Sequence, residues 1–149
     1  MAEIMVIGYG NEMRGDDGAG PFVAACIEAE NLPGVGVLIV RQLTPEIAAD
    51  LAETRCVVFV DARAGGEEVL VQRLETAVRD EWCAHRADPA ALLALTQAVY
   101  GCVPEAWWVT LPGFCFEVGE GLSPRAQAAA REAVDRVCSL IGAEKSCTN

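Results

Sequence analysis

Short apolar runs alternate with longer amphipathic stretches along the chain. Five runs are apolar or β-branched and are bounded by glycine, proline or polar residues; they cover residues 4–7, 36–41, 55–61, 67–74 and 106–111. Runs of this length and composition predict β-strands. The run at 55–61 is the most apolar and β-branched of the five, which predicts a central parallel strand.

Helices are predicted where a proline follows the glycine-rich loop or a capping residue. The expected starts are Pro21, Thr44-Pro45, Asp88-Pro89 and Ser123-Pro124. Gly101 is expected to end the third helix. In the fourth helix, apolar residues recur at helical spacing from Ala126 to Ile141. Gly142 is expected to end this helix, so that residues 144–149 form a loose tail.

The alternation of strands and helices predicts a single α/β domain over residues 1–149. The connection at 62–66 is too short for a parallel crossover, so the strand at 67–74 is expected to be an antiparallel neighbour of the strand before it. The predicted architecture is a three-layer α/β/α sandwich. Its twisted, mostly parallel, five-stranded sheet has one antiparallel edge strand.

The loop at residues 8–20 contains five glycines and the adjacent carboxylates Asp16 and Asp17. It follows the first predicted strand, and loops at the carboxyl ends of such strands bind ligands. The loop does not match a dinucleotide fingerprint, because Met13 stands where the third glycine is required, and it lacks the Lys-Ser/Thr pair of a phosphate-binding loop. Capping of the next helix would explain one of the two carboxylates well and both poorly.

A second acidic residue, Asp61, ends the most apolar strand and therefore needs a partner. Because parallel strands present their carboxyl ends at the same edge, Asp17 and Asp61 are expected to lie close together. His85 is the only histidine and precedes the third helix. It is either a solvated surface residue or the third member of an Asp, Asp, His set, which would suit Ni, Zn or Mn better than a soft metal.

Composition restricts the class of protein. The net charge of −11 argues against nucleic acid or an anionic membrane as a partner. The apolar runs are too short to cross a bilayer, and the amino terminus lacks a basic segment, so a cytoplasmic location is expected. The seven cysteines include no Cys-x-x-Cys pair and are expected to be reduced, mostly buried thiols.

Four segments together resemble one known family. They are Gly8-Tyr9-Gly10-Asn11, Asp16-Asp17-Gly18, Phe59-Val60-Asp61-Ala62 and His85. The sequence resembles the hydrogenase maturation endopeptidases, which remove the carboxyl-terminal extension from the large subunit of nickel–iron hydrogenases, and the resemblance runs from about residue 4 to 141. It implies metal binding by Asp17, Asp61 and His85, with Asp16 beside these ligands or acting as a base. Residues 41–46 and 109–113 look more like the branch that serves bidirectional, NAD(P)-linked hydrogenases.

The resemblance implies hydrolysis of one peptide bond near the carboxyl end of the large-subunit precursor, after nickel insertion. Nickel would come with the precursor and would bind the isolated protein, expected to be a monomer, only weakly. The sequence offers no Ser/His/Asp set or His-Glu-x-x-His helix, and Cys83 lies too near His85 to form a cysteine-protease pair. The alternative is a nickel-binding chaperone that docks on the precursor without cutting it, which would use the same residues.

Overall fold

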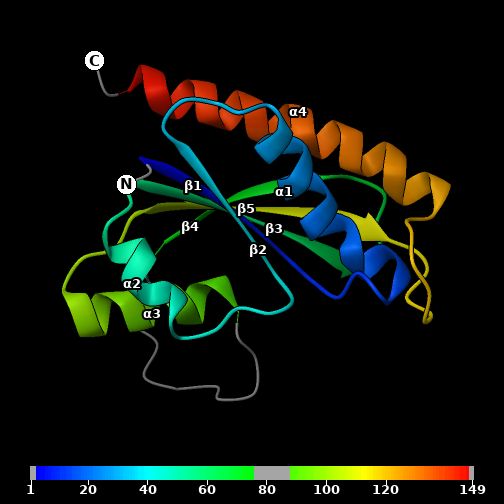
Figure 1. Ribbon diagram of the computed structural model, residues 1–149, viewed down its shortest axis with the longest axis horizontal. Coiled ribbons are helices and arrows are strands. Elements are labelled where there is room, and N and C mark those ends of the chain that lie inside the picture. The colour runs from blue at the N-terminus through cyan, green and yellow to red at the C-terminus, as the bar shows by residue number, and fades with distance from the viewer. Residues whose placement is uncertain (1–2, 76–87, 148–149) are drawn as a thin grey trace.

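A five-stranded sheet runs through the centre of the molecule in the computed structural model, which describes residues 3–75 and 88–147 (Figure 1). Its strands are β1 (Ile4–Tyr9), β2 (Val35–Val40), β3 (Cys56–Ala64), β4 (Leu70–Leu74) and β5 (Glu105–Gly113). The order across the sheet is β2-β1-β3-β5-β4. Strands β2, β1, β3 and β5 are parallel, and β4 runs antiparallel to β5. The predicted strand directions are therefore confirmed.

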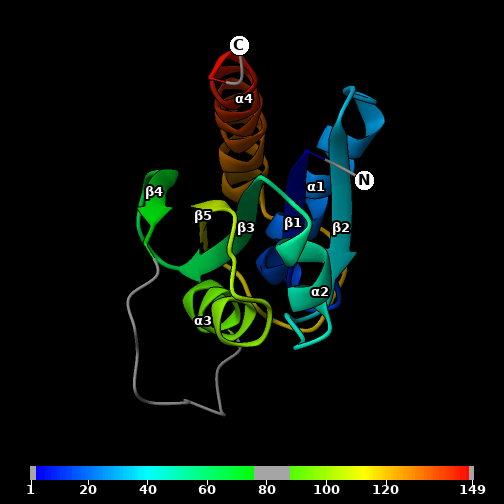
Figure 2. The ribbon, with the colours of Figure 1, turned by 90° about the vertical axis from the view of Figure 1, so that its left-hand side faces the viewer.

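Helices cover both faces of this sheet (Figures 1 and 2). Helices α1 (Ala19–Ala29) and α4 (Pro124–Ser146) pack on one face, while α2 (Ile47–Ala52) and α3 (Pro89–Tyr100) pack on the other. A short 3₁₀ helix, η1 (Gly15–Gly18), precedes α1. The predicted α/β/α sandwich is confirmed. No helix in residues 3–75 or 88–147 is long and apolar enough to cross a membrane.

Strand β3 lies at the middle of the sheet and supplies side chains to both cores. Val58 and Val60 face α1 and α4, whereas Val57 and Phe59 face α2 and α3. All four side chains are completely buried, as expected for the most apolar run of the sequence. Burial of a side chain such as that of Phe59 contributes about 1.5–3 kcal/mol. The core therefore fixes the position of the segment that leads into Asp61.

Three strands end beyond their predicted ends: β1 continues to Tyr9, β3 to Ala64 and β5 to Gly113. Strand β3 was expected to end at Asp61, but it continues to Ala64 because β5 runs beside it through Pro112 and Gly113. Proline is tolerated there because β4 pairs with β5 only as far as Thr110, so no strand needs an N–H on the outer side of Pro112. Asp61 therefore lies within β3, one residue past the last β3 residue that pairs with β1.

Strand β4 has a different neighbour from the predicted one. It is the antiparallel edge strand, but it pairs with β5 and not with β3. The connection from β3 crosses the end of β5, where the Arg63 guanidinium donates hydrogen bonds to the carbonyl and hydroxyl oxygens of Thr110 and to the carbonyl oxygen of Glu68. These bonds hold the short connection in place over the intervening strand.

The predicted caps of the third and fourth helices are confirmed. Asp88 Oδ1 accepts a hydrogen bond from the Ala91 N–H at 2.6 Å, and Ser123 Oγ accepts one from the Ala126 N–H at 3.2 Å. The predicted cap at Thr44 is wrong, because a turn at residues 44–46 precedes α2 and the N-cap position is Glu46. Helix α1 begins at Ala19, two residues before the predicted start.

The predicted end of the fourth helix is also wrong. Helix α4 continues past Gly142 to Ser146, and Glu144 is only 8% exposed. The Glu144 carboxylate lies 3.4 Å from an Arg55 guanidinium nitrogen and accepts a hydrogen bond from the Trp107 indole N–H at 3.2 Å. These contacts stabilise the last turns, so residues 144–146 belong to the helix and not to a loose tail.

Candidate functional site

The glycine loop, residues 8–20, folds back so that Gly10 and Asn11 contact Asp17. Oδ2 of Asp17 accepts a hydrogen bond from the Asn11 N–H at 2.7 Å. Gly10 lies directly against this turn with a φ of 148°, and a Cβ at this position would overlap the carbonyl oxygen of Asp17. Glycine is therefore required at Gly10 both for its backbone conformation and for the close approach.

The start of α1 lies directly on the carboxyl ends of β1 and β3. Gly20 makes this possible, because a Cβ there would overlap the Val60 carbonyl oxygen and lie 2.7 Å from that of Tyr9. This contact brings η1, and with it Asp17, over the ends of the two strands. Asp17 is then close enough to Asp61 for its charge to raise the pKa of Asp61. The structure thus brings together the two carboxylates that the sequence predicted to be neighbours.

Asp61 is partly buried among polar and apolar neighbours. Burial raises the pKa of its carboxyl from 3.8 to about 7, and the nearby charge of Asp17 acts in the same direction. The Ala62 N–H, 2.8 Å from Oδ1, and the Tyr9 hydroxyl donate hydrogen bonds that oppose this rise. Near neutral pH the group is therefore divided between its charged and neutral forms. Such perturbed carboxyls are typical of functional sites.

Tyr9 is a site residue that the sequence reading missed. Its side chain is 9% exposed, and its hydroxyl donates a hydrogen bond to Asp61. Burial raises the pKa of the Tyr9 phenol, and the adjacent Asp61 carboxylate raises it further. No local sequence signal marks this contact, because it depends on strand register: Gly8 pairs with Val60, so the next residues on both strands face the same side of the sheet.

Asp16, the first residue of the acidic pair, is completely buried. Its Oδ2 accepts hydrogen bonds from the Phe114 and Cys115 N–H groups and the Ser123 hydroxyl, and its Oδ1 accepts one from the Ser123 N–H, all at 2.7–3.0 Å. Burial alone would raise the pKa of Asp16, but these four bonds to the carboxylate lower it. Asp16 thus holds the segment 114–123 against the glycine loop, a structural function that the sequence did not reveal.

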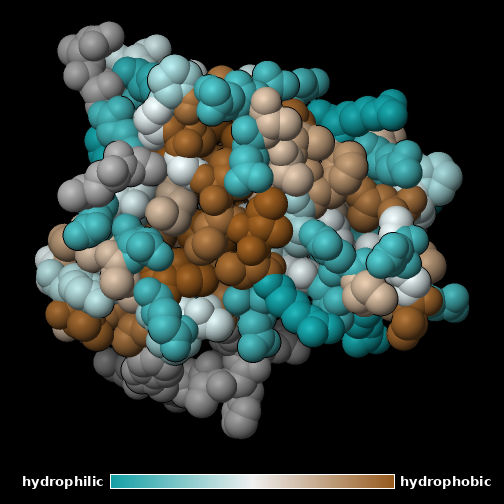
Figure 3. Space-filling view, viewed as in Figure 1, coloured by the Kyte–Doolittle hydropathy of each residue, from teal (hydrophilic) through white to brown (hydrophobic). Residues whose placement is uncertain are grey.

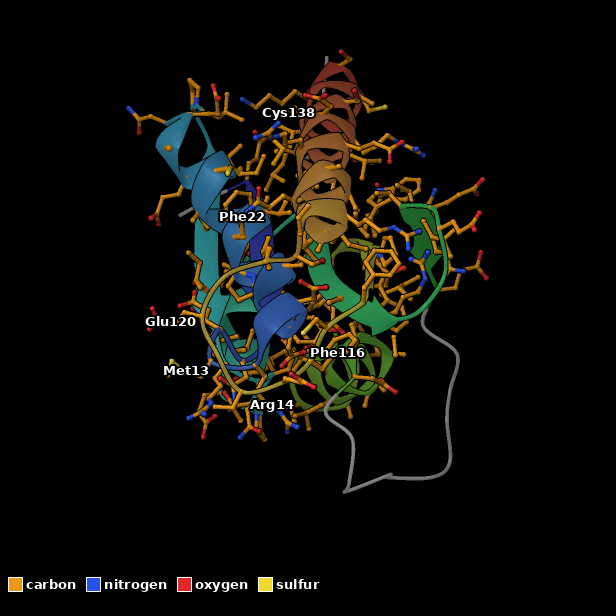
Figure 4. All side chains as sticks on the ribbon, turned by 90° about the vertical axis from the view of Figure 1, so that its right-hand side faces the viewer. Met13, Arg14, Phe22, Phe116, Glu120 and Cys138 are labelled. Atoms are coloured by element: carbon orange, nitrogen blue, oxygen red, sulfur yellow. The ribbon has the colours of Figure 1, made fainter. Side chains whose placement is uncertain are left out.

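A groove of about 820 Å³ lies beside the glycine loop. Its walls come from the glycine loop, the start of α1, the end of β2 and residues 120–122. Three large apolar side chains on these walls are exposed: Met13 by 50%, Phe22 by 41% and Ile39 by 38%. Figure 4 shows Met13, Phe22 and Glu120 on the same side of the molecule. Asn11 lines the groove and also holds Asp17, so one loop serves both features.

Known structures share this architecture, although no family model and no curated protein matches the sequence. The hydrogenase maturating endopeptidase HybD from E. coli superposes with a TM-score of 0.79 at 20% identity, covering 97% of this chain and 94% of that one. A hydrogenase 2 maturation peptidase from Thaumarchaeota archaeon SCGC_AB-539-E09 gives a TM-score of 0.72 at 26% identity, covering 94% of this chain and 98% of that one.

The protein has the fold of the hydrogenase maturation endopeptidases. A [NiFe] hydrogenase maturation protease HybD from Thermococcus kodakarensis agrees, with a TM-score of 0.73, 22% identity, and coverage of 94% of this chain and 99% of that one. The resemblance of the sequence motifs to this family is thereby supported.

In this maturation-endopeptidase fold, the predicted metal ligands fall into two groups. Asp17 and Asp61 lie together, and Oδ1 of Asp17 accepts no hydrogen bond from the described residues. His85 and Cys83 lie outside the described residues. Within residues 3–75 and 88–147, no three Cys, His, Asp or Glu side chains are arranged to hold a metal ion. Two carboxylates suit a divalent cation only if other groups supply further ligands. A partner that already holds nickel would supply those ligands itself.

Proposed function

We propose that the protein is an endopeptidase that removes the carboxyl-terminal extension from a nickel–iron hydrogenase large-subunit precursor. The observation that carries this proposal is the convergence of Asp17 and Asp61 on a fold whose solved relatives are named hydrogenase maturation proteases. The proposed place of action is the cytoplasm, and the proposed active form is a monomer. The motifs at 41–46 and 109–113 favour a precursor of the bidirectional, NAD(P)-linked type.

Nickel is part of the substrate in this proposal. Bound to the precursor, it marks a correctly loaded large subunit and polarises the peptide carbonyl or a water molecule near it. Asp17 contacts the metal through its free Oδ1, and Asp61 contacts it after losing its proton. A cation beside Asp61 favours the charged carboxylate, so docking of the loaded precursor itself lowers the raised pKa of this group. His85 is the proposed third ligand.

Tyr9 is a positioning residue in this scheme. Its hydroxyl bonds to the Asp61 carboxyl from within the sheet core and limits the rotation of that group. Asp16 acts on the same site from the other side, by fixing the loop that carries Asp17. The two carboxylates are therefore held before the precursor arrives, which reduces the entropic cost of forming the complex.

Mass spectrometry of the precursor tests the proposal. Purified protein is incubated with the nickel-loaded precursor, and a mass loss equal to a carboxyl-terminal peptide is expected. Metal-free and zinc-loaded precursors serve as matched controls and should remain uncut. A stable complex in which the nickel-loaded precursor keeps its full mass would instead support the alternative, a nickel-binding chaperone.

A further inference from the structure

Strand β2 forms one edge of the sheet, and nothing in its sequence protects that edge. Its residues are Val35, Gly36, Val37, Leu38, Ile39 and Val40, without a charged residue or proline. Natural proteins usually protect edge strands with lysine, proline or a bulge, because a free edge can pair with another chain. Figure 2 shows β2 at the end of the sheet, and Figure 3 shows apolar side chains gathered over it.

The pairing of β2 with β1 determines which backbone groups are free. The Ile4 N–H bonds to the Gly34 carbonyl and the Gly10 N–H to the Val40 carbonyl, so even-numbered residues of the two strands bond to each other. In a parallel pair, the alternate residues point their N–H and C=O groups away from the partner strand. The N–H and C=O groups of Val37 and Ile39 therefore face outward, where the described residues supply no neighbouring strand.

This free edge leads directly into the groove beside the glycine loop. Ile39, Val40 and Arg41 form one wall of the groove, and the loop that holds Asp17 forms another. Arg41 is the only cation among the groove residues, and it makes no ion pair within the described part of the chain. A strand added to β2 would thus reach the candidate site with its end beside the Arg41 guanidinium, which shares the groove lining with Glu12 and Glu120.

We propose that an extended, apolar segment of the precursor adds to the outer edge of β2 as a sixth strand. A carboxylate at the end of this segment that lies in the groove contacts Arg41. This inference rests on the proposed function and specifies its docking surface. Backbone pairing with the groups of Val37 and Ile39 supplies affinity, and the apolar walls at Phe22 and Ile39 select the side chains. A second copy of this chain fits less well, because two molecules of charge −11 repel each other.

Hydrogen exchange tests the pairing in the wild-type protein. Amide exchange in residues 35–41 is measured by mass spectrometry, alone and with the nickel-loaded precursor, while cleavage is followed in the same samples. Exchange at Val37 and Ile39 should slow at least tenfold in the complex, because both N–H groups become hydrogen-bonded. The size of the free protein is measured in parallel, and a dimer in which residues 35–41 are already protected would overturn the proposal.

Two variants of Ile39 separate the contribution of its backbone N–H to binding from that of its side chain. Ile39→Pro removes the outward N–H without breaking the β1 ladder, and Ile39→Ala keeps that N–H while removing most of the side chain. Ile39→Pro should bind the precursor about tenfold more weakly than Ile39→Ala, the effect of one lost backbone hydrogen bond. Thermal unfolding shows whether each variant is folded, and if Ile39→Pro is not, the exchange measurement on the wild type decides.

The outcomes distinguish the docking surface from the proposed function. Cleavage by the wild type without protection of residues 35–41, or equal binding by the two folded variants, would overturn strand addition and leave the endopeptidase proposal intact. Protection without cleavage would support strand addition and overturn the endopeptidase proposal. Neither binding nor cleavage would overturn both.

Discussion

The charged form of Asp61 lowers the free energy of unfolding, because the carboxylate is partly buried and lies near the charge of Asp17. Its pKa in the folded protein, about 7, is above the usual 3.8, so the folded state binds the proton more tightly than the unfolded chain does. Its contribution to stability is therefore complete below about pH 4 and is lost as the pH rises through 7. Above that range the protein keeps a charged carboxylate in a partly buried position, which the proposed contact with a precursor-bound cation would stabilise.

Replacement of Asp61 by Asn should separate stability from function. The amide keeps the shape of the side chain without the charge, so Asp61→Asn should raise the free energy of unfolding at pH 8 by on the order of 2 kcal/mol. The same change should abolish processing of the precursor. Urea unfolding at pH 5 and pH 8 measures the first effect, with the exposed Asp135→Asn as control. A variant that unfolds, or one that cuts normally, would contradict the role assigned to Asp61.

The adjacent acids Asp16 and Asp17 should respond differently to removal. Asp16→Ala leaves four donors without their carboxylate, and it should lower the free energy of unfolding by on the order of 3 kcal/mol. Because hydrogen bonding lowers the pKa of Asp16, its contribution should persist on acidification until the pH falls below the usual value of 3.8. Asp17→Ala loses one loop hydrogen bond and should unfold almost as the wild type does, but without processing activity. Equal stability losses in the two variants would refute this division of roles.

At the scale of elements, two glycines in helices offer a matched comparison. Gly20→Ala would push α1 away from β1 and β3, since the new Cβ meets two backbone oxygens, and it should destabilise the protein by roughly 2–3 kcal/mol. Gly142→Ala meets nothing within 4 Å in α4 and should stabilise it by about 0.5–1 kcal/mol. Differential scanning calorimetry gives both values. Destabilisation by Gly142→Ala would show that α4 ends where the sequence suggested.

Elements governed by local signals were predicted well, and those governed by distant contacts were not. The caps at Asp88 and Ser123 act within one helical turn and could be read directly. Gly142 suggested a helix end, but Arg55 and Trp107 hold Glu144 from other parts of the fold and override the weak helix propensity of one glycine. The partner of β4 depended on β5, which follows it by thirty residues and occupies the intervening place.

In the candidate site too, contacts that follow from strand order could be predicted, and contacts between distant segments could not. The approach of Asp17 to Asp61 followed from the common edge that parallel strands share, which needs only the order of strands and loops. The environment of Asp16 depended on Phe114, Cys115 and Ser123, which are 98 to 107 residues away in the sequence, and no local pattern announces such a contact. The hydrogen bond from Tyr9 required the register of β1 against β3, which periodicity alone does not give.

The molecule as a whole should bind nickel weakly when isolated. Asp17, Asp61 and the predicted ligand His85 give three donors, whereas closed structural sites normally have four. Calorimetric titration of nickel into the metal-free protein should therefore show weak, exchangeable binding. His85→Ala should lose both this binding and the processing of nickel-loaded precursor. A tight stoichiometric site that forms without the precursor would contradict the idea that the substrate completes the coordination.

The hydrogen bonds of Asp16 also set the order in which the protein becomes complete during synthesis. Asp16 is made early, but its partner Ser123 emerges from the ribosome 107 residues later. Until then, the loop that carries Asp17 has neither the segment 114–123 nor α4 to hold it. A nascent or truncated chain that ends before residue 114 therefore lacks every hydrogen bond that fixes the buried Asp16 carboxylate, and with them the anchor of the loop that carries Asp17.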